Sequence, residues 1–351
     1  MKVLIALLLV LGTGMTASAQ PGPVPGTQRT DLIFSGSDVV CSCYVVSTEV
    51  ESEEPRQPPP NVWRHMLATV EVRDAFKPAN LQPGDRLTIR FIREYPGVSM
   101  ALPTVTQSEG AILFLKKKAD GTFEFADTWI GANQFQILPQ ASKGAGLARL
   151  ESALLNILEQ AQPGGPNHDD LRALYMLEGL PVLSPEGMAR MPKLANSSYP
   201  NVALAAIGTL LKTKSPQNVQ LLKDYLDNYL GAEEPVSVWS IGAYLREVRA
   251  PEALPALEAL SGSRFTSVQV GAMDALRNIK SPSSPPILVQ RLDDPNSTVR
   301  YQAVITLAET FGKGQEFAPS MKLFDDDPEK YVALWKSWWS QQDGVAPQPT
   351  K

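Results

Sequence analysis

The sequence predicts an α+β protein of two domains, in which an N-terminal antiparallel β-barrel or small sandwich precedes an α-solenoid of helix pairs. Three observations predict this fold. One helix-forming pattern recurs at a nearly constant spacing in the C-terminal half of the chain. Short runs of alternating apolar and polar residues fill much of the N-terminal third. The chain has 351 residues, 43% of them hydrophobic, which is enough for two cores.

The clearest copy of the repeated pattern is the stretch 294–311, DPNSTVRYQAVITLAETF. We expect Asp294 to cap this helix and Pro295 to occupy its first turn, where a missing N–H costs nothing. Gly312 and Gly314 are expected to end it. The apolar stripe is wide, so the helix should contact more than one neighbour. Its members are Val299, Ala303, Val304, Leu307, Ala308 and Phe311.

Copies of this pattern begin at 171, 202, 236, 268 and 299, a spacing of 31 to 34 residues. Each clear copy has an apolar residue, a small residue four positions later and a large apolar residue eight positions later. A second helix fits into each of the last three intervals, at Pro216–Leu230, Pro251–Ser261 and Pro285–Leu292. A fixed period with one helix pair per period is typical of an α-solenoid. The alternative is an ordinary helical bundle with a chance spacing.

The core Val299, Arg300 and Ala303, with Asp293-Asp294-Pro295 before it, resembles the short HEAT-like repeat family. The resemblance covers roughly half of the chain and implies a helical solenoid fold. Because the repeat pattern is degenerate, it implies little about function.

The N-terminus has the pattern of a secretory signal peptide over residues 1–19. Met1-Lys2 precedes an apolar run at 3–11, and Ala17-Ser18-Ala19 forms an A-x-A cleavage site. The run is too short to anchor the chain in a bilayer. We therefore expect a secreted or periplasmic protein that is not inserted in the membrane after cleavage. The expected segments are a flexible leader at 20–30, a β-barrel domain at 31–140, a solenoid at 141–341 and a disordered tail at 342–351.

Five or six short strands are expected in the N-terminal domain, and the Asp-Gly pair at 120–121 between two of the β-type runs is a strong hairpin signal. The charged, proline-rich segment Glu51–Pro60 is expected to be a loop, because proline cannot continue a strand ladder. The runs are Asp38–Val50, His65–Phe76, Arg86–Arg93, Ala111–Lys118 and Thr122–Ala126.

The order of Ser37–Val40, Ala68–Lys77 and Gly110–Leu115, with the Asp-Gly hairpin after them, resembles the OB-type barrel of netrin-like and metalloproteinase-inhibitor domains. In the inhibitor family, a cysteine at the mature N-terminus binds the zinc ion of the protease. Here Cys41 and Cys43 fall inside the first strand instead. The resemblance therefore implies the fold but not the inhibitory chemistry.

Cys41 and Cys43 are two residues apart on a strand, which places their Cα atoms about 6.6 Å apart on one face. That distance is near the upper limit for a disulfide. We expect two buried apolar residues, with a thiol pair as the alternative. The chain's two histidines, His65 and His168, are far apart in sequence and give weak support for a zinc site.

The sequence has no phosphate-binding glycine loop, no H-E-x-x-H and no G-x-S-x-G motif. The carboxylates of Asp293-Asp294 and Asp325–Asp327 precede helix starts, where capping explains them. Glu51, Glu53 and Glu54 are expected in a solvated loop, with a loose calcium site as the alternative. We therefore predict no catalytic residue, no metal, no cofactor and no enzymatic activity. A net charge of −5 argues against a nucleic-acid partner.

These observations favour an exported, non-enzymatic binding or scaffolding protein. A solenoid offers a long concave surface, which we expect the second helix of each pair to line, with a protein or peptide lying along it. Within Pro216–Leu230, the candidate contact residues are Lys223, Asp224, Asp227 and Asn228. Two alternatives are open: the barrel regulates or inhibits a secreted protease, or the chain is a HEAT-like lyase of the type that attaches bilins in phycobilisomes.

Overall fold

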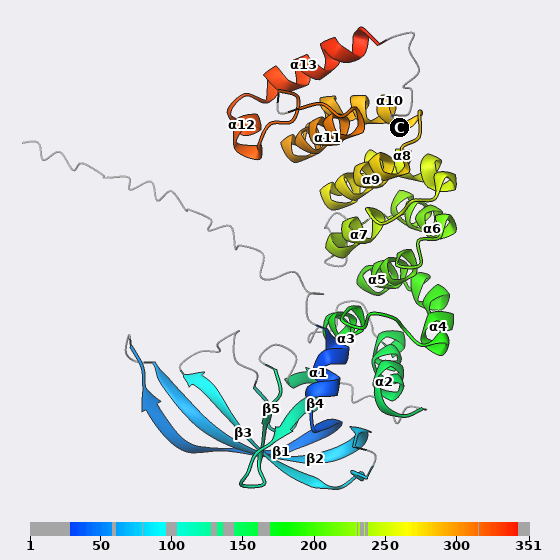
Figure 1. Cartoon of the computed structure of the whole chain (residues 1–351). Coiled ribbons are helices and arrows are strands. Elements are labelled where there is room, and N and C mark those ends of the chain that lie inside the picture. The colour runs from blue at the N-terminus through cyan, green and yellow to red at the C-terminus, as the bar shows by residue number, and fades with distance from the viewer. Residues whose placement is uncertain are drawn as a thin grey trace, which may run out of the picture.

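The computed structural model shows a β-barrel followed by a curved stack of helix pairs (Figure 1), which confirms the predicted two-domain α+β fold. The predicted signal peptide, most of the leader, and the tail beyond Gln342 lie outside the described residues. The structure describes residues 29–57, 61–78, 80–95, 104–127, 132–135, 144–160, 169–229, 231, 235, 238–314 and 316–342.

The strands form a closed five-stranded barrel with one extra strand. The order around it is β1-β2-β3-β5-β4, and β4 pairs back with β1 to close the sheet, while β6 pairs with β4 alone. Neighbouring strands are antiparallel except β3 and β5, which run parallel at Ile89 and Phe123. The predicted barrel is confirmed, and the narrower netrin-like resemblance stays a prediction. The strands are β1 (Val39–Pro55), β2 (Val62–Lys77), β3 (Arg86–Tyr95), β4 (Gly110–Lys117), β5 (Phe123–Phe125) and β6 (Ala132–Phe135).

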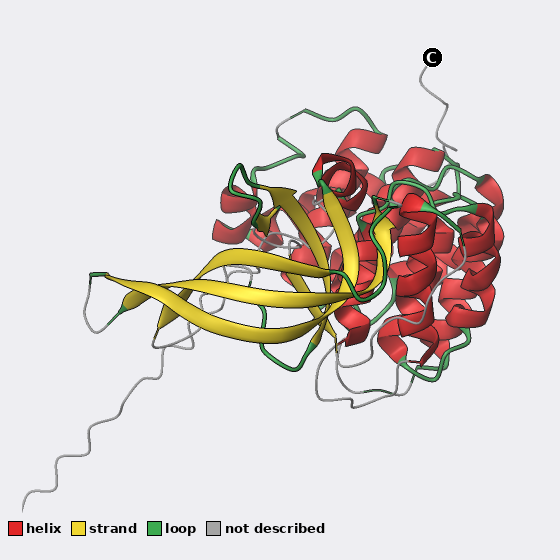
Figure 2. Cartoon of the chain, turned by 90° about the horizontal axis from the view of Figure 1, so that it is seen from below, coloured by secondary structure: helices red, strands yellow, loops and turns green. Residues whose placement is uncertain are grey.

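The outer halves of β1, β2 and β3 project from the barrel, away from the helices (Figure 2), and we call residues 46–55, 62–67 and 90–95 the wing. The expectation that 51–60 cannot be strand is wrong for 51–55. Pro55 is tolerated because it is the last residue of its strand. The glutamates are tolerated because they pair across strands: Glu53 with Arg64 at 2.6 Å, and Glu51 with Arg90 at 3.0 Å.

Alternation along β1 separates two cores. Val39, Cys41, Cys43 and Val45 point into the barrel, whereas Val40 points outward toward the helices. Both cysteines are fully buried and free, which confirms the expectation of two buried apolar residues. Burial in this apolar interior raises the pKa of the Cys43 thiol well above its ordinary value.

A short helix, α1 (Thr30–Gly36), stands where the sequence predicted the end of a flexible leader and the start of the β region. It is held by long-range contacts that leave little local signal. Thr30 donates from Oγ1 to the carbonyl of Met176 at 2.9 Å and from its backbone N–H to Gly179 at 3.0 Å. Lys77 of β2 donates to the carbonyl of Ser35 at 2.8 Å. The helix therefore bridges the barrel and the solenoid.

The outer face of the barrel and the solenoid share one hydrophobic core, which is separate from the core inside the barrel. Phe114 and Ile112 on the outside of the barrel belong to the same buried cluster as Leu154 of α2 (Gly146–Gln160). An ion pair joins the two units as well, between Arg149 of α2 and the buried Asp74 of β2 at 2.5 Å. The two units are thus packed together as one body rather than joined by a linker alone.

The helices after α2 form two rows (Figure 1): α4, α6, α8 and α10 on the outer side, and α5, α7, α9 and α11 on the inner, concave side. The repeated helix of the sequence is the inner, second member of each pair. The three predicted second helices, which correspond to α6, α8 and α10, are therefore the first members of the following pairs. The bounds are α3 (Asp169–Glu178), α4 (Pro185–Ala195), α5 (Pro200–Leu211), α6 (Pro216–Asp227), α7 (Val238–Leu245), α8 (Leu254–Ser261), α9 (Thr266–Ile279), α10 (Ser284–Gln290), α11 (Ser297–Thr310), α12 (Met321–Asp326) and α13 (Pro328–Ser340), with 3-10 turns at Pro251–Ala253 and Arg291–Asp293.

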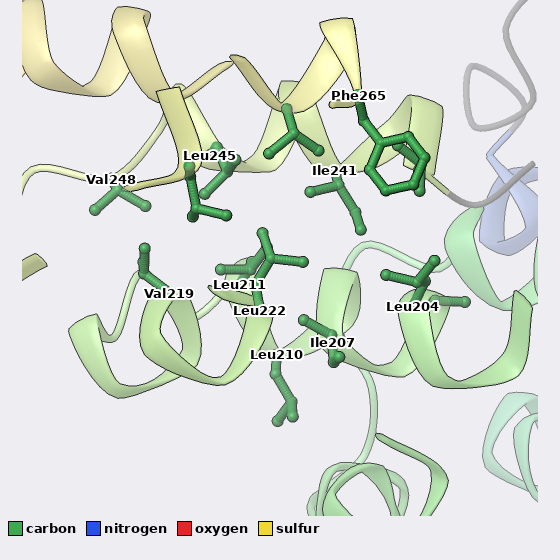
Figure 3. Close-up of a cluster of buried hydrophobic side chains, with 14 of the residues drawn as sticks. Leu204, Ile207, Leu210, Leu211, Val219, Leu222, Ile241, Leu245, Val248 and Phe265 are labelled. Atoms are coloured by element: carbon green, nitrogen blue, oxygen red, sulfur yellow. The ribbon is translucent and has the colours of Figure 1, made fainter. Parts of the chain in front are cut away.

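The two rows bury their apolar faces against each other. Figure 3 shows Ile207 of α5, Leu222 of α6 and Ile241 of α7 meeting in this layer. The inner helices α7 and α9 cross so closely that glycine is required. A Cβ on Gly271 would lie 2.4 Å from the carbonyl oxygen of Gly242 and 2.6 Å from its Cα. These helices therefore pack backbone against backbone.

For α11, the predicted N-terminal cap is wrong and the predicted glycine stop is confirmed. Asn296, and not Asp294, caps α11, since its side chain accepts from Thr298 N at 2.9 Å. Asp294 instead accepts from Gln269 Nε2 at 2.9 Å and from the backbone N–H of Asn296. Gly312 has φ +62 and follows the helix as the predicted stop.

The C-terminal helix α13 closes the open end of the solenoid core. Trp335 has no exposed surface and donates from Nε1 to the carbonyl of Phe317 at 3.0 Å. Trp338 packs on Phe311 with ring centroids 4.7 Å apart. These aromatic rings cover the last repeat, as expected of a terminal cap.

Candidate interaction surface

The inner row of helices turns one side of each helix to the core and the other to solvent. The solvent-facing positions near the middle of these helices are small, aliphatic or amide side chains without charge. Ala243 of α7 is exposed and the others are half-buried. We call this surface the inner face: Thr209, Ala243, Val270, Gln302 and Ile305.

The inner helices all end along one edge of the solenoid, and each end carries cations. Lys212 follows α5, Arg246 follows α7 and Arg277 lies in the last turn of α9. Lys214, Arg249 and Lys280 follow these cations by two or three residues, and Lys313 is the third residue after α11. We call this region the basic edge, and its members are Lys212, Lys214, Arg246, Arg249, Arg277, Lys280 and Lys313.

Fewer acidic side chains lie among these cations. Lys214 contacts Glu247 at 3.8 Å, and Arg277 contacts Asp274 at 3.2 Å and also pairs with Glu309. With Glu178, that makes four carboxylates against seven cations. The basic edge is therefore locally positive on a chain whose net charge is −5.

Two of these carboxylates, the half-buried Glu178 and the buried Asp274, link inner helices to one another. Glu178 at the end of α3 accepts from Ser240 Oγ of α7 at 3.0 Å, yet burial raises the pKa of Glu178. Burial also lowers the pKa of Lys212, and the charge of Glu178 opposes that shift. Asp274 accepts from Gln302 Nε2 of α11 at 2.8 Å, and burial raises its pKa despite the nearby arginines. These groups act as links between helices.

The four residues predicted to contact a partner lie on α6 in the outer row, so the structure does not bring them to the inner face. Their polar groups bond within the helix. Lys223 pairs with Asp227 at 2.5 Å, and Asn228 donates to the carbonyl of Asp224 at 2.7 Å. Their role in binding stays a prediction. Nothing in the sequence indicated which helix of a pair faces inward. The prediction assigned the inner side to the wrong helix, and these four residues therefore lie in the outer row.

A second concave region lies where the wing diverges from the β4–β5 hairpin. This cleft has a volume of about 430 Å³ and an apolar side where Phe91 and Phe125 pack with ring centroids 5.7 Å apart. Arg90 at its rim pairs with Glu51 and with Asp120. Hydrogen bonds from Thr122, with a smaller contribution from Arg90, lower the pKa of Asp120. The charged groups named here are thus paired with one another.

The part of the chain that the structure describes contains neither a cluster of metal-binding side chains nor a helix that could span a membrane. Within those residues, no three His, Cys, Asp or Glu side chains come together to hold a metal ion. His65 lies 3.8 Å from Glu54 in the wing, and His168 lies outside the described residues. None of the described helices has both the length and the apolarity needed to cross a bilayer.

The comparison with protein families agrees with the geometry of the solenoid. Residues 232–308 and 251–335 match the family model of HEAT repeats, a region that includes α7 to α11. The predicted HEAT-like resemblance is thus confirmed for this part of the chain, and HEAT-type repeats suggest a role in protein interaction. A search of curated proteins finds no match to this chain.

Proposed function

We propose that this chain is an exported, non-enzymatic binding protein whose inner face holds an extended segment of a partner protein. The observation that carries the proposal is the open inner face itself. Four successive inner helices each present at least one uncharged side chain that is half-buried or exposed, next to an edge of charged ones. Concave surfaces of this kind are the usual binding surfaces of repeat proteins.

An extended peptide fits the spacing of this surface. Packed helices lie about 10 Å apart, so the inner face repeats at about that distance. A strand advances about 3.3 Å per residue, so every third residue of an extended peptide meets the next helix. Small side chains such as Ala243 let a peptide backbone approach closely.

Export and the lack of catalysis are parts of the same proposal. The signal-peptide pattern at residues 1–19 supports export. Separation of the source cells into cytoplasmic and exported fractions tests it, and a chain found only in the cytoplasm would contradict it. Two observations support a binding role: Arg90 at the cleft beside the wing is paired with Glu51 and Asp120, and the sequence lacks the catalytic motifs named above.

The binding role is tested by blocking the inner face. Ala243→Arg places a bulky charge at an exposed position of α7, and we expect it to abolish partner recovery in cross-linking pull-downs from the exported fraction. Ala259→Arg is the matched control, since Ala259 is an exposed alanine on α8 of the outer row. Equal recovery with both variants would exclude the inner face as the binding surface.

A further inference from the structure

The basic edge repeats with the period of the helices. Lys212 and Arg246 are 34 residues apart, and Arg246 and Arg277 are 31 apart. Lys280 is followed after 33 residues by Lys313. One repeat after another thus places a cation just where its inner helix ends, which makes a row of positive charges along the solenoid.

Part of this pattern has a purely structural explanation. Cations near a helix C-terminus are favoured by the helix dipole and can bind its last carbonyls. Arg249 does so, because its Nη1 donates to the carbonyls of Arg246 at 2.6 Å and Val248 at 3.0 Å. Lys212 similarly donates to the carbonyl of Glu178 at 3.4 Å. These cations already have a role within the fold.

The helix dipole favours the charges of Lys214 and Lys280 as well, but it does not explain the backbone conformation of these two residues. Both have left-handed backbones, with φ of 61° and 55°, a conformation that favours glycine; Lys280 directly follows α9, and Lys214 is the third residue after α5. A side chain there costs stability, and the equivalent Gly312 avoids that cost. Both lysines are exposed. A lysine that occupies a strained backbone position, where glycine would be more stable, indicates that its exposed charge has a function.

We infer that the basic edge binds an acidic, extended segment of a partner protein, with carboxylates at about every third residue. This inference rests on the proposed function and names the class of segment that the inner face holds. The match follows from spacing: successive cations are about 10 Å apart, and three residues of an extended chain span about that distance.

A nucleic acid fits this edge less well. Acidic side chains such as Glu247 and Glu309 stand between the cations. A polyphosphate backbone is charged at every unit and would meet these carboxylates, whereas a peptide can place uncharged residues opposite them. The net charge of −5 adds a long-range repulsion against a strongly anionic polymer.

The test measures binding of a fluorescent 12-residue peptide with glutamate at every third position to the full chain by anisotropy. The double variant Lys214→Gly/Lys280→Gly removes two charges and also relieves the strained backbones, so it should melt at or above the wild-type temperature. We expect about 3- to 20-fold weaker peptide binding, since an exposed ion pair contributes up to about fivefold. The control double variant Lys322→Gln/Lys330→Gln, on α12 and α13, should bind as the wild type does.

Higher salt should weaken binding, because exposed charges are screened. Unchanged affinity in the Lys214/Lys280 variant, or equal binding of a peptide with its glutamates in one block, would overturn the inference. Tighter binding of single-stranded DNA or of vesicles rich in phosphatidylserine would overturn it too. If Ala243→Arg abolishes partner capture while the lysine variant preserves it, the proposed function stands and this inference fails.

Discussion

Replacing Gly271 with alanine should destabilise the solenoid, although alanine is the better helix former. On an isolated helix, the change would stabilise the chain by about 1 kcal/mol. Here the added methyl would lie 2.4 Å from the carbonyl oxygen of Gly242 and 2.9 Å from its carbonyl carbon, closer than the 3.0 Å that real Cβ atoms keep. The obstacle is the backbone of α7, which cannot rotate away.

The inner helices α7 and α9 must therefore move apart to accept the methyl group. Overpacking of this kind costs about 1 to 3 kcal/mol. Because the clash is with backbone atoms, we expect a cost in the upper part of this range, about 2 to 3 kcal/mol. Subtracting the helix gain of about 1 kcal/mol leaves a net loss of about 1 to 2 kcal/mol. The displacement also separates the core layer around Ile241, which lies on α7.

Urea unfolding followed by circular dichroism at 222 nm measures this loss. Gly314→Ala is the matched control, since a Cβ there meets nothing within 4 Å and its backbone is not left-handed. That control should change stability by no more than about 0.5 kcal/mol. A Gly271→Ala chain as stable as the wild type, or more stable, would refute the close crossing of α7 and α9.

Three further changes test other parts of the structure. Because the pKa of Glu178 is raised, the folded state binds this proton more tightly than the unfolded state does, and ionisation of Glu178 costs stability as the pH rises above the ordinary pKa of 4.5. Glu178→Gln should therefore be more stable than the wild type at pH 8 in urea unfolding, and the difference should be smaller at pH 4. Arg149→Met leaves the carboxylate of Asp74 buried without its ion pair and should cost about 3 kcal/mol; Asp74→Asn in the same chain should restore part of that loss, and no restoration would contradict the pairing. Trp335→Ala opens a cavity at the C-terminal cap and should cost about 3 to 5 kcal/mol; a loss below 1 kcal/mol by calorimetry would show that α13 does not close the core.

The helix repeats could be predicted because each repeat buries apolar side chains at the same sequence spacing. Val268, Ala272 and Leu276 follow the four-residue pattern and are all fully buried. The small residue at the middle position allows close approach, and the large one fills the space between rows. The pattern does not reveal which member of a pair faces inward, because both members are amphipathic.

The wing could not be predicted because its strands are stabilised by partners far along the chain. The segment 51–55 is polar, and its glutamates become acceptable only beside Arg64 and Arg90. Likewise α1 depends on carbonyls near residue 176, which no local pattern indicates. The basic edge did leave a signal, the recurrence of lysine or arginine just after each inner helix. It is recognisable only once the helix ends are known.

The packing of α2 against the outside of the barrel limits how this protein can change in evolution. Phe114 and Leu154 belong to one buried cluster, so each unit would expose an apolar face without the other. A recombination event that cut the chain between them would expose both surfaces to water and favour aggregation. Any homologous exchange of the barrel must then carry α2 with it, and the two units should be inherited as a pair.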